Sequence, residues 1–147
     1  MAPLIALCTG FLVARLAGLL GVEPLDNWQA GLRVGLALMF ALTGIAHFTA
    51  KRRGDLIAMV PPALPRPDVL VTVTGVLELL GAAALLIPAT APWAAGGLAL
   101  LMVAMFPANV SAARRRLSLG GRPVTRLGPR TALQVIFVAA AVAVALG

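Results

Sequence analysis

The amino-acid sequence predicts an all-α integral membrane protein with five transmembrane helices. The chain is 61% hydrophobic and 12% charged, whereas soluble domains carry about a quarter charged residues. Its long apolar runs are each close to the roughly 20 residues that span a bilayer as an α-helix. Most basic residues are confined to two segments between these runs, which is typical of loops on one side of a membrane.

The predicted helices belong to a single transmembrane domain, 1–147, and cover residues 2–22, 28–50, 69–88, 93–113 and 131–146. The first run lacks the basic start and the small-residue cleavage site of a signal peptide, so it is expected to remain as a helix. Trp28 and Trp93 mark the membrane interface at the start of two helices. Between Arg53 and Asp68, four prolines are expected to prevent a regular helix. Residues 114–130 are expected to form an aqueous loop.

The distribution of positive charge predicts the orientation. The net charge is +7, which in a soluble domain would indicate nucleic acid. Here the basic residues flank apolar runs, so anchoring and contact with anionic lipids of the bilayer are favoured and no nucleic-acid partner is expected. Both basic loops are expected to be cytoplasmic, with the N-terminus inside and the C-terminus outside. The two clusters comprise Lys51, Arg52, Arg53, Arg66, Arg114, Arg115, Arg116, Arg122, Arg126 and Arg130.

Glu78 is an isolated acid near the middle of an apolar run. Such a residue normally faces the interior of a helix bundle and has a partner there. Counting from the cytoplasmic helix ends places Glu78 near mid-membrane and Arg33 and Arg15 in the outer half. Arg33 is therefore the preferred partner of Glu78 and Arg15 the alternative, and the three form the predicted buried polar core. Small residues that would let another helix approach share the face of Glu78: Gly75, Gly81 and Ala82.

This predicted core has two interpretations. It is either a structural ion pair that fixes the register of the helices, or a polar site that binds a quinone, a lipid headgroup or a proton.

A second group of polar residues is predicted near the cytoplasmic helix ends. His47, Asn109 and Gln134 lie there with Pro61 and Pro62, and together they would suit a ligand with one polar end. Alternatively, each side chain caps a helix end or bonds a carbonyl that proline leaves free. His47 is expected to be shallow and separate from Glu78. No metal site is expected, because no second histidine, cysteine or carboxylate cluster stands near His47.

Recognisable catalytic motifs are absent from the sequence. It contains no phosphate-binding glycine loop, nucleophile elbow or zinc motif. Cys8 is the only cysteine, so neither an intramolecular disulfide nor a Cys-x-x-Cys pair can form. No catalytic residue can be assigned, and whether the chain is an enzyme stays open.

Several short motifs in order along the chain resemble the DoxX family of small bacterial membrane proteins, in particular its DoxX-like branch. They are Arg33-x-Gly35, Gly44-x-x-His47-Phe48, Val60-Pro61-Pro62-x-Leu64-Pro65-x-Pro67, Gly75-x-x-Glu78-x-x-Gly81, Phe106-Pro107-Ala108-Asn109 and Leu133-Gln134. The resemblance covers residues 29–147. It implies a DoxX-like four-helix transmembrane bundle, to which residues 2–22 add one N-terminal helix.

The resemblance also implies a function in the bacterial inner (plasma) membrane. Relatives include a subunit of a thiosulfate:quinone oxidoreductase, so the expected function is a membrane subunit or accessory of a quinone-linked redox system. Quinone is then the expected cofactor and an oxidoreductase the expected partner. Two alternatives remain: a non-catalytic assembly or scaffold protein, and a small carrier for a hydrophobic compound. Self-association into a homo-oligomer is also left open.

Overall fold

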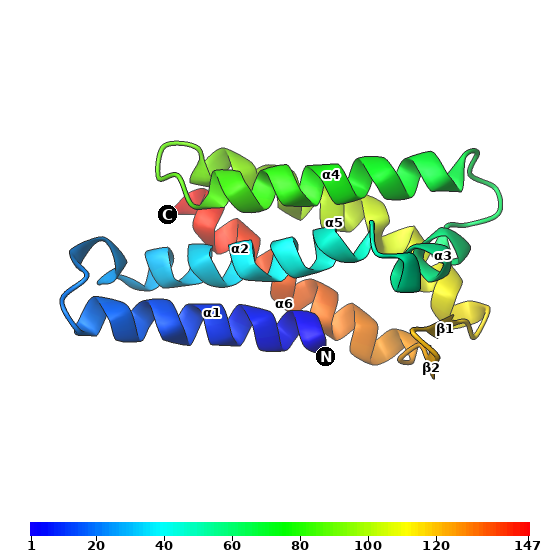
Figure 1. The fold of residues 1–147 in the computed structure, drawn as a ribbon, viewed down its shortest axis with the longest axis horizontal. Coiled ribbons are helices and arrows are strands. Elements are labelled where there is room, and N and C mark those ends of the chain that lie inside the picture. Colours follow the sequence, from blue (N-terminus) through cyan, green and yellow to red (C-terminus); the bar gives the residue numbers. More distant parts are fainter.

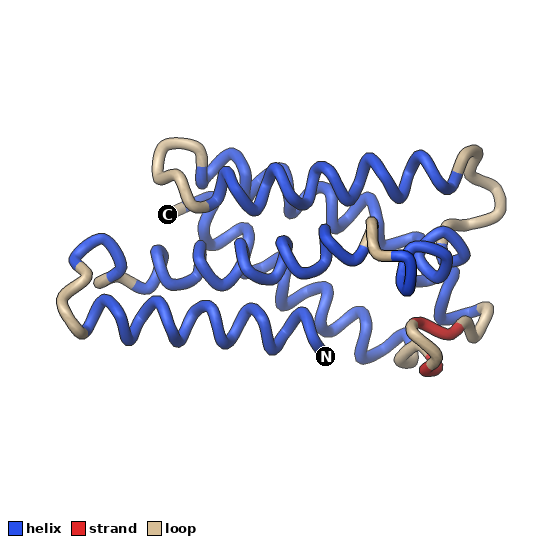
Figure 2. The backbone as a smooth tube through the Cα atoms, in the orientation of Figure 1, coloured by secondary structure: helices blue, strands red, loops and turns tan.

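The computed structural model of the protein describes residues 1–147 and is almost entirely helical (Figures 1 and 2). Five of its six α-helices are long and apolar enough to cross a membrane, which confirms the predicted class and the five predicted spans. The elements are α1 (Ala2–Leu19), η1 (Glu23–Leu25), α2 (Trp28–Ala46), α3 (Ala50–Met59), α4 (Pro67–Leu85), α5 (Ala91–Arg114), β1 (Ser118–Leu119), β2 (Arg122–Pro123) and α6 (Leu127–Leu146).

Helix α2 lies at the centre of the bundle. It packs against α1, α4 and α6, while α5 packs against α4 and α6. Helices α2, α4, α5 and α6 thus form one group, and α1 lies beside it, mainly in contact with α2 (Figure 1). The start of α2 is set locally, because the Asn27 side chain accepts a hydrogen bond from Ala30 N at 2.7 Å, as an N-cap does.

The prediction that residues 53–68 hold no regular helix is wrong. Helix α3 covers Ala50–Met59, and Met59 is buried. All four prolines follow α3, beginning at Pro61. A proline disturbs its own position and the residue before it, and Val60 is accordingly extended, with φ −57° and ψ 132°. The effect of the prolines therefore does not reach back into α3.

Glycines bring the backbones of α1 and α2 into direct contact. Gly10, Ala14 and Gly18 recur every four residues on the buried face of α1. A Cβ atom added to Gly10 would lie 2.8 Å from Gly35 Cα, and one added to Gly35 would lie 2.5 Å from Leu7 O. Small residues at this spacing are a common way for membrane helices to associate closely, and the sequence analysis did not use this signal.

The segment between α5 and α6 is a short hairpin. Strands β1 and β2 pair antiparallel around Gly120 and Gly121, whose φ angles are +63° and +76°. Two consecutive residues with positive φ favour glycine and give the tight turn that hairpins prefer. Helix α6 begins at Leu127 and not at residue 131. The hairpin, α3 and the loop before α4 lie at one end of the bundle (Figure 1), so the two basic clusters share that end, which we call the basic end.

The α1–α2 contact predicts unequal effects of two glycine substitutions. Gly35→Ala should lower the free energy of unfolding by about 1–3 kcal/mol, because the new methyl group overlaps the α1 backbone. Gly96→Ala is the control, since nothing lies within 4 Å of its added Cβ and alanine favours a helix by about 1 kcal/mol over glycine. Unfolding in detergent micelles measures both variants. Equal stability of the two would contradict the packing described.

Candidate functional site

His47 and Glu78 are the two buried polar side chains of the protein, with 5% and 4% of their surface exposed. His47 is the C-cap residue of α2, and Glu78 lies within α4. The two helices are antiparallel neighbours in the bundle (Figure 1). A buried acid and a buried imidazole in an otherwise apolar bundle are expensive to place in a membrane, which makes them the candidate site.

Two glycines bring the histidine and the acid together. A Cβ atom on Gly75 would lie 2.6 Å from His47 Cβ, and one on Gly44 would lie 3.3 Å from Glu78 Cβ and 2.9 Å from two atoms of Leu79. The motifs Gly44-x-x-His47 and Gly75-x-x-Glu78 have the same spacing and run in opposite directions. Each polar side chain therefore lies against the glycine of the other helix.

The contact between the two side chains is not a direct hydrogen bond. His47 Nδ1 lies 3.9 Å from Glu78 Oε2. It lies 2.8 Å from the backbone oxygen of Thr43, and because a carbonyl can only accept, Nδ1 carries the proton and donates it there. Glu78 Oε2 is buried and has no hydrogen-bond partner in the protein. The site is thus one hydrogen-bond partner short.

The electrostatic surroundings favour a neutral His47. Burial lowers the pKa of His47, the hydrogen bond to Thr43 O acts in the opposite direction, and the positive charge of Arg53 lowers the pKa further. A neutral imidazole does not balance the charge of an ionised carboxylate. Any charge on Glu78 must therefore be neutralised by a proton or by a group from outside the protein.

The predicted pairing of Glu78 with Arg33 or Arg15 is wrong. Arg33 donates to the last carbonyls of α4, from Nε to Leu85 O at 3.1 Å and from Nη2 to Leu86 O at 3.3 Å. Leu85 is seven residues, about 10 Å along a helix, beyond Glu78. Arginine is a good donor for such free helix-end carbonyls.

Arg15 is engaged at the turn between α1 and α2. Its Nη1 donates to Leu25 O at 3.2 Å and lies 3.6 Å from Asp26 Oδ1. Of the three residues of the predicted polar core, only Glu78 is therefore buried within the bundle as expected.

The predicted separation of His47 from Glu78 is also wrong. Helix α2 ends at Ala46, level with Gly75, which is eight residues or about 12 Å inside the start of α4 at Pro67. His47 is consequently deep with respect to α4, and α3 occupies the space beside the end of α2 (Figure 1). Counting residues from helix ends failed because α2 stops short of the level that α4 reaches.

The other members of the predicted pocket bond elsewhere. Asn109 Oδ1 accepts from Arg130 Nη2 at 2.7 Å, and Gln134 Nε2 donates to Met102 O at 2.7 Å. Both contacts join α5 to α6, and they differ from the alternative interpretation too: Asn109 bonds a side chain, and the carbonyl of Met102 is not the one that Pro107 leaves free, which belongs to Val103. Pro61 is half-buried and Pro62 exposed on the loop before α4.

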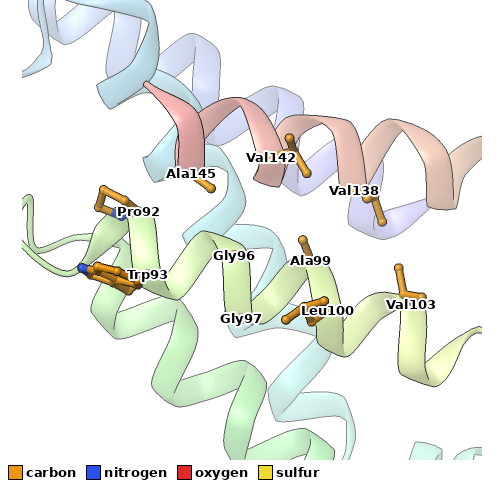
Figure 3. A pocket seen from close by; sticks show the side chains of 10 residues that line it. All are labelled: Pro92, Trp93, Gly96, Gly97, Ala99, Leu100, Val103, Val138, Val142 and Ala145. Atoms are coloured by element: carbon orange, nitrogen blue, oxygen red, sulfur yellow. The ribbon is translucent and has the colours of Figure 1, made fainter.

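Two apolar grooves lie on the sides of the bundle, and neither is lined by His47 or Glu78. One of about 630 Å³ runs between α5 and α6 (Figure 3), and one of about 360 Å³ lies between α4 and α5. The first is lined by Pro92, Trp93, Gly96, Gly97, Ala99, Leu100, Val103, Val138, Val142 and Ala145. The protein contains no group of three or more histidine, cysteine or acidic side chains that could hold a metal ion.

Three contributors to the site were missed by the sequence analysis. The roles of Gly44 and Thr43 follow from the antiparallel packing of α2 and α4, and that of Arg53 from α3, which was not predicted. The equal spacing of the glycine–histidine and glycine–glutamate motifs was a signal that could have revealed the pair.

The unpartnered Oε2 of Glu78 predicts the effect of removing the charge of this residue. Glu78→Gln should leave the thermal stability of the purified protein unchanged or raise it, because it removes a buried acid whose Oε2 has no hydrogen-bond partner in the protein. The matched control is Asp26→Asn, which removes the acid beside Arg15 at the exposed turn and should change stability by no more than about 0.5 kcal/mol. A loss of several kcal/mol in Glu78→Gln alone would show that the carboxylate is a structural ion pair.

Comparison with known proteins identifies a family. No curated protein and no solved structure matches the chain, and no comparison links it to the DoxX family. One family model does match, over residues 36–145, which include most of α2 and all of α3, α4 and α5. The match also includes His47, Glu78 and both glycines that bring them together. The chain belongs to the family described as a domain of unknown function, DUF8561.

Proposed function

We propose that this protein is a multi-pass protein of the bacterial inner membrane that binds the polar end of a hydrophobic molecule at the His47–Glu78 pair. The molecular class we propose is a quinone, and the role is that of a membrane subunit or accessory of an oxidoreductase. The resemblance to DoxX proteins supports the redox context, and the apolar bundle supports a membrane-soluble ligand.

The observation that carries this proposal is the unpartnered Oε2 of Glu78. Buried polar atoms are almost always bonded, so an exception calls for an unseen partner. A quinone supplies a carbonyl acceptor in its oxidised form and a hydroxyl donor in its reduced form. A protonated carboxyl group can donate to the former, and an ionised one can accept from the latter.

A scaffold function is the second candidate, and a different observation favours it. Several partly buried polar side chains join elements of the bundle: Arg33 joins α2 to α4, Gln134 joins α6 to α5, and Arg15 joins α1 to the following turn. In a pure scaffold the His47–Glu78 contact would serve the same purpose. It would then stabilise the bundle, which the Glu78→Gln measurement tests directly.

Quinone binding should stabilise the folded protein through the carboxyl group of Glu78. Adding decyl-ubiquinone or decyl-ubiquinol at ten to a hundred times Kd should contribute about 1.4–2.7 kcal/mol, a rise in Tm of a few degrees. Glu78→Gln should reduce or abolish this rise, and Asp26→Asn should retain it. If neither form of the quinone changes the Tm of the wild-type protein, the quinone class is wrong.

The proposed orientation places the basic end, with α3 and the hairpin, in the cytoplasm. With Cys8 replaced by serine, a cysteine at the exposed Ser118 should react with an impermeant maleimide only after the cells are opened. A cysteine at the exposed Pro24, at the other end, should react in intact spheroplasts. The reverse pattern would invert the topology.

A further inference from the structure

We propose that Arg53 is the positioning residue of the His47–Glu78 pair, fastening the end of α2 and helix α3 to α4 and closing the pair off from the basic end. This inference rests on the proposed function only in treating the pair as a binding site. It concerns how the site is held and covered, whichever ligand occupies it.

The contacts of Arg53 join three elements at one point. Its Nη1 donates to the backbone oxygen of His47 at 3.1 Å. Its Nη2 donates to Thr72 Oγ1 at 2.9 Å and to Asp68 O at 3.3 Å. The guanidinium group of Arg53 thus bridges the C-cap residue of α2 and the first turns of α4. Its planar set of fixed donors suits such a bridge better than the ammonium group of lysine.

Helix α3 forms two other hydrogen bonds to neighbouring elements, and neither involves His47 or Glu78. Asp55 Oδ2 accepts from Gly120 N at 2.6 Å, which joins α3 to the hairpin. Arg115 Nη1 donates to Ala58 O at 2.8 Å, which joins α3 to the end of α5. These two hydrogen bonds fix the position of α3, whereas Arg53 is the residue of α3 that also bonds the backbone oxygen of His47.

The same bridge closes the side of His47 that faces the basic end. Helix α2 stops at Ala46, and after the short turn at residues 47–49 the chain forms α3, which lies at the basic end of the bundle (Figure 1). The charged groups beside His47 are Glu78 on α4 and Arg53 on α3. A cation at this place disfavours a positive charge on the imidazole. The imidazole therefore stays neutral, with its one N–H, on Nδ1, donated to Thr43 O.

The single histidine of the chain makes its accessibility directly measurable. The full-length protein, purified without a histidine tag, is treated with diethylpyrocarbonate, and the carbethoxylation of His47 is followed by mass spectrometry. Arg53→Gln should raise the rate about tenfold, because a local opening becomes easier by the loss of a charge-assisted bridge. Arg115→Gln, which loosens α3 without touching His47, should react at the wild-type rate.

A second measurement separates positioning from general loosening. The imidazole of His47 is titrated by NMR, and Arg53→Gln should move the titration to higher pH because a positive neighbour is lost and solvent enters. Arg115→Gln should titrate as the wild type does. The proposal would be overturned if His47 in Arg53→Gln were carbethoxylated at the wild-type rate and titrated at the wild-type pH. It would also be overturned if Arg53→Gln and Arg115→Gln raised the rate of carbethoxylation equally.

A milder variant keeps the test decisive if Arg53→Gln does not fold. Thr72→Val removes one acceptor of Arg53, and it should accelerate modification in the same direction by a smaller factor, whereas a wild-type rate would overturn the proposal. None of these measurements contains a quinone. The quinone proposal can therefore fail while the role of Arg53 stands, and the role of Arg53 can fail while the quinone proposal stands.

Discussion

The close approach of α2 and α4 is the constraint on which the site depends. A side chain at Gly44 would meet Leu79 and Glu78, and one at Gly75 would meet His47. With larger residues there, the helices would separate, and His47 and Glu78 would no longer lie 3.9 Å apart. In a membrane, where lipid offers no hydrophobic force between helices, such close packing is a main source of association. The glycines therefore serve both the stability of the bundle and the placement of its two buried polar groups.

The arginines of the bundle explain why Glu78 has no cation. A free carbonyl at a helix end in a membrane must find a donor, because water is scarce. Arg33 donates to the end of α4, Arg53 to the end of α2 and Arg115 to the end of α3. These three guanidinium groups are thus engaged by backbone carbonyls, and none of them contacts the carboxylate of Glu78. A buried acid with an unpartnered oxygen lowers stability, and proteins commonly retain such groups where they bind or react.

The helices were predictable from sequence because length and hydropathy are local properties, and all five spans are found. Helix α3 was missed because the prolines after Val60 were taken to act on the residues before it. The contact between Glu78 and His47 was missed for a different reason: depth was counted from helix ends, and α2 ends about 12 Å inside the start of α4. The loops alone do not reveal that difference. The difference in level follows from two contacts, that of Gly44 with Glu78 and that of Gly75 with His47. In the sequence, the equal spacing of the glycine–histidine and glycine–glutamate motifs was the signal for these contacts.

The central claim is that Glu78 faces His47 and no arginine. Solid-state NMR of the protein in lipid bilayers, with ¹³C in glutamate and ¹⁵N in histidine and arginine, measures this directly because the chain has one histidine. The structure predicts a dipolar coupling between the Glu78 carboxyl carbon and His47 Nδ1 that corresponds to the 3.9 Å contact with Oε2. It predicts no comparable coupling to an arginine Nη. A strong coupling of the Glu78 carboxyl group to arginine, with none to His47, would contradict the site described.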